Sequence, residues 1–139
     1  GSYGDPAAVP LRIWRMLKGV AKNTTGYTHQ WRHCPPVYSR YVMASVESVE
    51  QAEAAHSMGY RTFRVRMAEE PLEANEFVCP ASAEAGKRLT CEQCKACSGS
   101  KSSPGAVSPV IIFHSPSCMT KWMEPAYRRE RVSLQVLSA

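Results

Sequence analysis

The sequence contains no long apolar run and no leader-like beginning. A membrane-spanning helix needs about 18 or more apolar residues in succession, and a secretory signal needs a basic segment followed by an apolar one. Neither pattern occurs in the 139 residues. We therefore expect a soluble, cytoplasmic protein that does not associate with membranes.

Common catalytic motifs and internal repeats are also missing. The sequence has no Walker loop, no HExxH motif and no Ser-His-Asp order, which are patterns typical of phosphate-binding proteins and hydrolases. Gly4-Asp5-Pro6 is too short to carry a mechanism by itself. No motif supports enzymatic activity, and a non-catalytic role is favoured.

The composition is that of an ordinary globular domain. Hydrophobic residues make up 44% and charged residues 21% of the chain, so disorder and fibrous architectures are not indicated. The length predicts a single domain over residues 1–139. A net charge of +5 permits binding to nucleic acid or to an acidic protein partner.

Apolar periodicity predicts an α/β fold. We expect helices over residues 9–22 and 48–58, and strands over residues 41–46, 60–67 and 110–113. Ser48 and Gln51 form a capping-box pattern, and Gly59 supplies a left-handed stop. A strand, helix and strand connected in this way imply a parallel pair with a right-handed crossover. The predicted architecture is a small, mostly parallel sheet with flanking helices.

Two arginines lie on one face of the strand expected over residues 60–67. Phe63 and Val65 point to one side of the alternating pattern and Arg64 and Arg66 to the other. These guanidinium groups could bind a phosphate or a carboxylate. Alternatively, they form a solvated edge.

Residues 68–107 show little periodicity and many turn-forming residues, which predicts a long loop. Within it, residues 76–108 are expected to form an inserted metal-binding module. Beyond the last expected strand, Pro116 ends the pattern and Pro125 predicts a helix break. Residues 132–139 fit a strand or a helix equally well.

The strongest signal is a cluster of cysteines. Cys91, Cys94 and Cys97 follow one another at three-residue steps, so that one short loop can direct three thiolates at a common centre. Cys79, in Cys79-Pro80, lies far enough upstream to return as the fourth ligand. The spacing therefore predicts a metal centre held by these four cysteines.

Zn²⁺ is the expected metal ion, and a [4Fe-4S] cluster is the alternative that the spacing leaves open. Four thiolates complete the closed tetrahedral shell of a structural Zn²⁺ site, whereas the C-x2-C-x2-C run is also that of bacterial [4Fe-4S] proteins. The basic residues Lys87, Arg88 and Lys95 are expected to lower the thiol pKa values and favour metal capture. Cys34 and Cys118 have no close cysteine partner and are expected to be buried apolar residues.

A second candidate site lies in residues 26–33. Tyr27, His29, Trp31 and Arg32 place aromatic, imidazole and guanidinium groups outside any periodic pattern. In open α/β sheets, ligands bind at the carboxyl ends of the strands, and this segment could form such an edge. A packed aromatic corner is the alternative.

Four motifs together resemble a known family. Tyr3-Gly4-Asp5-Pro6, residues 27–31 (Tyr-Thr-His-Gln-Trp), Cys79-Pro80-Ala81-Ser82 and the Cys91 cluster follow the order seen in the carboxyl half of the "gene product 88" family of phages and plasmids. The resemblance covers most of residues 3–114. It implies a protein of a mobile genetic element, acting in a bacterial host.

Full-length members of that family look similar to radical-SAM-type partial barrels. This chain lacks the C-x3-C-x2-C triplet of the cluster that cleaves S-adenosylmethionine, so that chemistry is not expected. Three functions are considered. The first is a metal-stabilised binding module that engages nucleic acid or a host nucleoprotein complex. The alternatives are an anti-CRISPR-like inhibitor of a host defence system, acting through protein contacts, and an iron-sulfur redox or radical enzyme fragment.

Overall fold

A five-stranded parallel sheet forms the centre of the computed structural model, which describes residues 4–22, 24–86, 89–99 and 107–113. The strand order is β1-β2-β3-β5-β4, and every neighbouring pair is parallel. The strands are β1 (Tyr27–Thr28), β2 (Met43–Val46), β3 (Thr62–Arg66), β4 (Glu76–Val78) and β5 (Ser108–Ile112). The prediction of an α/β fold with a small parallel sheet is confirmed.

Helices and 3₁₀ turns connect these strands. They are α1 (Leu11–Val20), α2 (Val49–Ser57) and α3 (Cys91–Cys94), with the turns η1 (Pro6–Ala8), η2 (Pro36–Arg40) and η3 (Ala83–Ala85). The predicted limits of α2 are confirmed: the Ser48 hydroxyl accepts a hydrogen bond from the Gln51 amide at 3.2 Å, and Gly59, with φ of +82°, follows the helix. None of the helices in the described residues is long and apolar enough to cross a bilayer.

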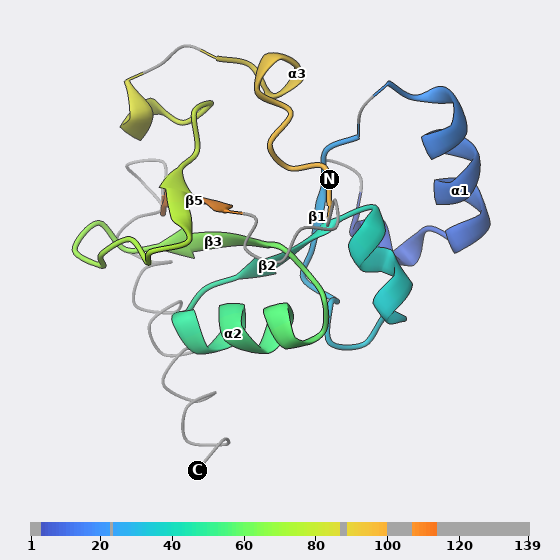
Figure 1. Cartoon of the computed structure of the whole chain (residues 1–139), viewed down its shortest axis with the longest axis horizontal. Helices are drawn as coiled ribbons and strands as arrows, with labels where there is room; N and C mark the ends of the chain where they lie inside the picture. The colour runs from blue at the N-terminus through green and yellow to red at the C-terminus, as the bar shows by residue number, and fades with distance from the viewer. Residues whose placement is uncertain (1–3, 23, 87–88, 100–106, 114–139) are drawn as a thin grey trace.

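The handedness of the crossovers places the chain on both faces of the sheet. From β2 to β3 the chain moves one strand along the sheet, and α2 crosses on one face. From β4 to β5 it moves in the opposite direction. Because parallel crossovers are right-handed, this reversal places the described parts of the connection, residues 79–86 and 89–99, on the other face. In Figure 1, α2 and α3 lie on opposite sides of the sheet.

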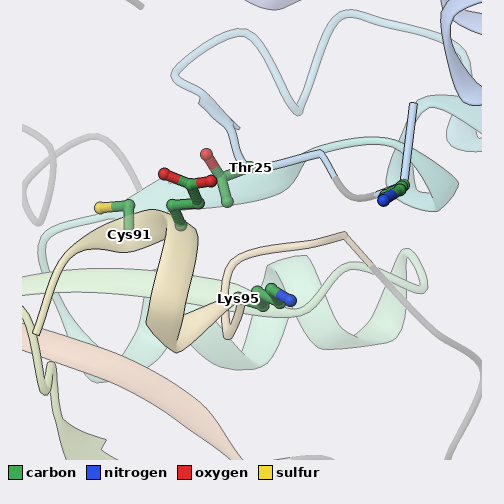
Figure 2. A pocket seen from close by; sticks show the side chains of 5 residues that line it. Thr25, Cys91 and Lys95 are labelled. Carbon is green, nitrogen blue, oxygen red and sulfur yellow. The ribbon is translucent and has the colours of Figure 1, made fainter.

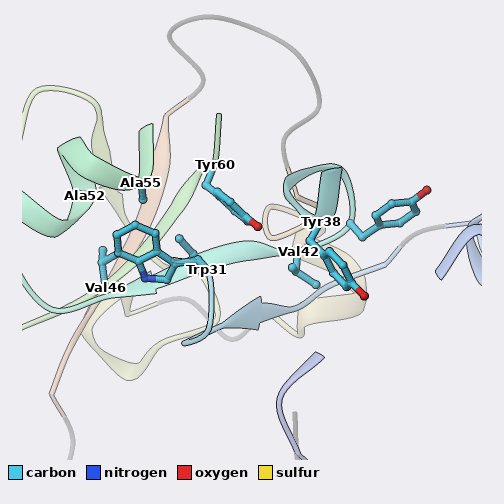
Figure 3. Close-up of a cluster of buried hydrophobic side chains, with 9 residues drawn as sticks. Trp31, Tyr38, Val42, Val46, Ala52, Ala55 and Tyr60 are labelled. Carbon is cyan, nitrogen blue, oxygen red and sulfur yellow. The ribbon is translucent and has the colours of Figure 1, made fainter. Parts of the chain in front are cut away.

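The face that α2 covers contains the main hydrophobic core. Ala44 and Val46 of β2 meet Ala52 and Ala55 of α2, and Trp31 is 1% exposed among them. Figure 3 shows these side chains together with the tyrosines of the same cluster. Burying an aliphatic or aromatic side chain stabilises a fold by about 1.5–3 kcal/mol, so this cluster is the main support of the sheet.

Two parts of the fold differ from the prediction. The stretch expected to be a loop contains β4, η3 and α3, and the segment of the second candidate site contains β1. Both strands are too short, at three and two residues, to produce a clear alternating pattern. The expectations for Pro116, Cys118, Pro125 and residues 132–139 fall outside the described residues.

Helix α1 packs on the core through only part of its predicted apolar face. Leu11 and Trp14 contact the main core, and the Trp14 indole donates to the carbonyl of Pro6 at 3.0 Å. Leu17, which continues the apolar spacing of three residues from Leu11 and Trp14, is 41% exposed. No residue of α1 is buried, so the helix rests on the domain edge.

Arg64 and Arg66 lie inside the protein and bind its own acidic residues. The Arg64 side chain is 1% exposed and donates to both oxygens of Glu76, at 2.8 and 2.7 Å, and to Glu70 at 3.2 Å. Arg66 pairs with Glu84 of η3. An external phosphate would have to displace these carboxylates, so the structure assigns the two arginines an internal role in place of the predicted binding role.

Replacing Glu76 with alanine tests this internal role. The change leaves the Arg64 guanidinium buried without its two-point partner, and we expect the free energy of unfolding in urea to fall by about 3–5 kcal/mol. Glu73, an exposed neighbour, provides the control, and Glu73→Ala should change stability by less than about 0.5 kcal/mol. Equal effects of the two substitutions would contradict the proposed role of the pair.

The contribution of the Arg64–Glu76 pair to stability should depend on pH. Burial raises the pKa of Glu76, but the hydrogen bond and charge of Arg64 outweigh it, and the net pKa is lowered. A lowered folded-state pKa means that the pair stabilises the protein above the ordinary carboxyl pKa and that this contribution is lost as pH falls through the folded value. The stability of the wild type should therefore fall more steeply below about pH 4.5 than that of Glu76→Ala.

Candidate metal centre

Cys79 is held by the sheet at the point where the cysteine-bearing connection begins. It follows β4 directly, and its amide donates to the carbonyl of Val110 in β5 at 2.8 Å. The carbonyl of Cys79 accepts from the amide and the hydroxyl of Ser82, at 2.9 and 2.7 Å. Cys79 is buried, and this turn fixes its backbone.

The next two cysteines are carried by the single turn of α3. Thr90 and Gln93 form a reciprocal capping box at its start, which satisfies two otherwise unpaired amides. Lys95, with φ of 56°, reverses the chain at its end. Cys91 is exposed and Cys94 half-buried, and α3 has no buried residue.

Arg61 clamps the chain on both sides of Cys97. Its guanidinium donates to the carbonyls of Ala96 and Gly99 at 3.0 and 3.3 Å, and to that of Val107 at 2.6 Å. The carbonyl of Cys97 itself accepts from the amide of Gly26, just before β1, at 3.1 Å. Cys97 is therefore attached to the edge of the sheet.

Gly99 lets this segment lie directly on the backbone of residues 40 and 41. Its φ is +75°, and a Cβ at this position would lie 2.9 Å from the carbonyl carbon of Tyr41. Side chains at such φ values are strained, and backbone atoms cannot rotate out of the way. Arg61 and Gly99 were not singled out from the sequence, since their roles depend on contacts far apart in the chain.

Three of the four cysteines line one cavity of about 370 Å³. Cys79, Cys91 and Cys97 surround it with residues of β1, β3 and β5 and of the segments beside them, namely Thr25, Gly26, Tyr27, Phe63, Ala81, Ser82 and Ile111. Cys79 also forms a small core cluster with Met43 and Phe63, against which Cys97 packs. The structure thus brings two separate stretches of the chain to one place on the sheet.

The ionisation of Cys97 reflects this crowding. Burial raises the pKa of the Cys97 thiol to about 12, and the nearby Cys79, Cys91 and Cys94 add to the shift, whereas Arg61 opposes it. The pKa of the Cys97 thiol is therefore raised and not lowered as expected, because burial outweighs the charge of Arg61. Lys87 and Arg88, which were expected to lower it, lie outside the described residues. A metal that bound here would have to displace the thiol proton.

The four thiols are near neighbours without forming a tight ligand set. Among the described residues, no group of three or more Cys, His, Asp or Glu side chains is arranged to hold a metal ion. In a closed zinc site with Zn–S bonds of about 2.3 Å, tetrahedral geometry places the sulfurs only about 3.8 Å apart. The described residues therefore do not form a closed zinc site.

A further cavity, of about 400 Å³, adjoins Cys91 on the side of the segment before β1. Lys22, Thr25, Cys91, Glu92 and Lys95 line it, and Figure 2 shows Cys91, Thr25 and Lys95 at its border. The exposed thiol of Cys91 is therefore accessible from solvent-filled space.

A groove of about 460 Å³ continues from the cysteine cavity along the same face of the sheet. Tyr27, Phe63 and Ile111 line both spaces. The rings of Tyr27 and Phe63 are stacked, with centroids 4.9 Å apart. The remaining lining comes largely from the carboxyl-terminal half of the sheet and the residues just after it: His29, Ser45, Glu47, Val65, Ile112 and Phe113.

The second predicted site is divided between this groove and the core. Tyr27 and His29 line the groove. Trp31 instead is buried, and its indole donates to the carbonyl of Ser45 at 3.1 Å, so its ring packs in the core and offers no surface to a partner. Arg32 is exposed, with its guanidinium 3.9 Å from the centre of the Trp31 ring. The crowding of aromatic and charged residues in this segment could not show which of them pack in the core and which line the groove.

Asp5, which appeared too isolated to matter, positions the start of the groove. Its carboxylate accepts hydrogen bonds from the amides of Ala7 and His29, both at 2.8 Å, and from the Thr28 hydroxyl. Burial raises the pKa of Asp5, but these hydrogen bonds outweigh it and the pKa is lowered. Asp5 thus attaches the amino-terminal segment to β1.

Comparison with family models, curated proteins and solved structures finds no match for this chain.

Thiol alkylation should separate the exposed cysteine from the enclosed one. In metal-free protein at neutral pH, Cys91 is exposed whereas Cys97 is half-buried with a raised pKa, and the thiolate is the reactive form. We expect iodoacetamide to modify Cys91 at least about tenfold faster than Cys97, as read by peptide mass spectrometry. Equal rates would show that the enclosure of Cys97 is not maintained in solution.

Gly99→Ala should weaken the attachment of the cysteine segment. The left-handed conformation alone costs about 1–2 kcal/mol for a residue with a side chain, and the close contact with residues 40 and 41 adds to this. Gly19 lies in α1 with open space around its Cα, and Gly19→Ala should stabilise the protein by about 0.5–1 kcal/mol. The melting temperature should therefore fall in Gly99→Ala and rise in Gly19→Ala.

Proposed function

We propose that the protein is a metal-centred binding protein in which Cys79, Cys91, Cys94 and Cys97 hold the centre. The observation that carries this proposal is the convergence of three of these cysteines on one cavity, with the fourth close enough to affect the ionisation of Cys97. All four donors are thiolate-forming side chains, which suit zinc and iron-sulfur centres.

The need for a centre follows from the packing of the cysteine segment. Neither α3 nor η3 has a buried residue, so little hydrophobic burial holds the middle of this connection. Metal ligation supplies folding free energy directly when a segment has no core of its own. Bound metal would fix α3 over the sheet and complete the wall of the cysteine cavity.

The size of the cavity and the spacing of the cysteines favour a [4Fe-4S] cluster over a single Zn²⁺ ion. A cubane places its cysteine sulfurs farther apart than one ion does, and the cavity of about 370 Å³ exceeds the space that one ion needs. The C-x2-C-x2-C spacing of Cys91, Cys94 and Cys97 agrees with this choice. Zn²⁺ is the alternative centre.

The groove beside the cavity is the proposed binding surface. It lies on a parallel sheet toward the carboxyl ends of the strands, where open α/β proteins place their ligands. Tyr27 and Phe63 line both the groove and the cysteine cavity, so the metal centre would support one wall of the groove. Nucleic acid, a host nucleoprotein complex and a host defence system remain predicted partners, as does an origin in a phage or plasmid.

Metal content and thiol variants test the centre. Protein purified without oxygen should be brown and contain iron and sulfide, and Cys91→Ser, Cys94→Ser and Cys97→Ser should each lower metal binding by about tenfold or more. Cys34→Ser is the matched control, because Cys34 packs at the main core beside the Tyr60 hydroxyl. It should leave the metal content unchanged.

The outcomes distinguish the alternatives. Stoichiometric zinc in protein purified both in air and without oxygen would replace the cluster by zinc and retain the four ligands. Protein that contains no metal under either condition, and whose melting temperature is not raised by zinc or by cluster reconstitution, would overturn the proposal, because a ligand that binds only the folded state must stabilise it.

A redox role is the second candidate function. The observation that favours it is the shared lining of the groove and the cysteine cavity by Tyr27, Phe63 and Ile111, which would place a ligand next to an iron-sulfur centre. If this role holds, dithionite should reduce the cluster to a paramagnetic form visible by electron paramagnetic resonance. A centre that dithionite cannot reduce would leave only the binding role.

A further inference from the structure

Helix α1 presents an apolar surface that the described part of the protein does not cover. Met16 is 71%, Leu17 41% and Val20 83% exposed. Residues three and four apart lie side by side on a helix, so these three form one continuous ridge, which we call the α1 ridge. Contiguous exposed apolar side chains on a helix mark an interaction surface.

The segment that carries the α1 ridge has charges of one sign. Between Asp5 and Glu47 the sequence contains no acidic residue. It contains six basic ones in that stretch: Arg12, Lys18, Arg15, Lys22, Arg32 and Arg40. Arg12 and Arg15 are exposed on α1 itself, and Arg12 lies one turn before Met16. A partner of this surface should therefore combine apolar and acidic groups.

A surface with both apolar and acidic groups lies at the end of the domain opposite α1. The loop between β3 and β4, residues 67–75, has Glu69 and Glu73 exposed, and between them Leu72 is 43% exposed. Glu70 and Glu76 hold this acidic loop in place through Arg64. Figure 1 places α1 and this loop at opposite ends of the long axis of the domain.

We propose that the protein associates head to tail, with the α1 ridge of one copy against the acidic loop of the next. Arg12 and Arg15 would face Glu69 and Glu73, and the α1 ridge would cover Leu72. Since the two surfaces are different and lie at opposite ends, the contact is heterologous and can repeat along a row of copies. Surfaces this small give weak, concentration-dependent association, in the class of interfaces below about 1,200 Å².

Nucleic acid fits the α1 ridge less well than a second copy does. Phosphates would satisfy Arg12 and Arg15 but would leave Met16 and Val20 in water. The acidic loop covers both kinds of group, and its position at the far end explains why one copy cannot satisfy its own surface. This inference does not depend on the metal centre.

Charge reversal tests the contact directly. In sedimentation velocity of the protein as purified, the average mass at low salt should rise with concentration, and high salt should weaken association by about tenfold. The variant Arg12→Glu with Arg15→Glu and the variant Glu69→Lys with Glu73→Lys should each be monomeric, because like charges then meet. Mixing the two variants should restore association, since the acidic helix of one then meets the basic loop of the other.

Two further variants serve as controls. Glu50→Lys with Glu53→Lys adds the same positive charge as Glu69→Lys with Glu73→Lys but places it on α2, away from both surfaces, and this variant should associate about as well as the wild type. Val20→Ser should weaken association without altering the melting temperature, since Val20 is 83% exposed. A protein that stays monomeric at high concentration and low salt, association that survives either reversal, or variants that fail to pair when mixed would each overturn the proposal.

Discussion

The right-handedness of parallel crossovers is the constraint on which the arrangement of this protein depends. The connection through α2 and the connection from β4 to β5 run in opposite directions along the sheet, so they must lie on opposite faces. One face thereby receives a helix and a conventional apolar core, whereas the other receives the cysteine segment. A centre built from this segment therefore rests directly on the strands.

The two faces are stabilised by different means. On the face covered by α2, alanines of α2 and the Trp31 ring fill the space against β2. On the face covered by the cysteine segment, hydrophobic contact is limited to a small cluster around Met43 and Phe63. There, hydrogen bonds such as those of Arg61 hold the segment in place. The protein thus combines an ordinary core with a layer whose order depends on hydrogen bonds and on the proposed ligation.

Much of the fold could be predicted from local pattern. The helix cap at Ser48, the strand pattern of β3 and the apolar run in β5 each record a short-range preference, and the corresponding elements appear in the structure. The reciprocal half of the predicted capping box does not form, because the Gln51 side chain accepts from the backbone amide of Glu47. What could not be predicted depends on partners distant in sequence. Arg64 looked like a surface arginine because its carboxylate partners arrive from a different strand and loop, and β1 is defined only by its pairing with β2.

The candidate centre shows the same division. Three of the four cysteines selected by their spacing line one cavity, but the groove could be found only from the structure, because its lining comes from four strands and the residues just after them. Trp31 shows why composition misled: an aromatic residue in an irregular segment is as suited to a core as to a binding surface. Burial distinguishes the two, and burial depends on the whole fold.

The unequal anchoring of the cysteines sets an order in which a centre would form. Cys79 is attached to β5 and Cys97 to the segment before β1, whereas α3 buries no residue. In the proposed centre, the positions of Cys79 and Cys97 would be fixed before ligand binding, and Cys91 and Cys94 would bind afterwards. Assembly of the centre and ordering of this wall of the groove would then be one event.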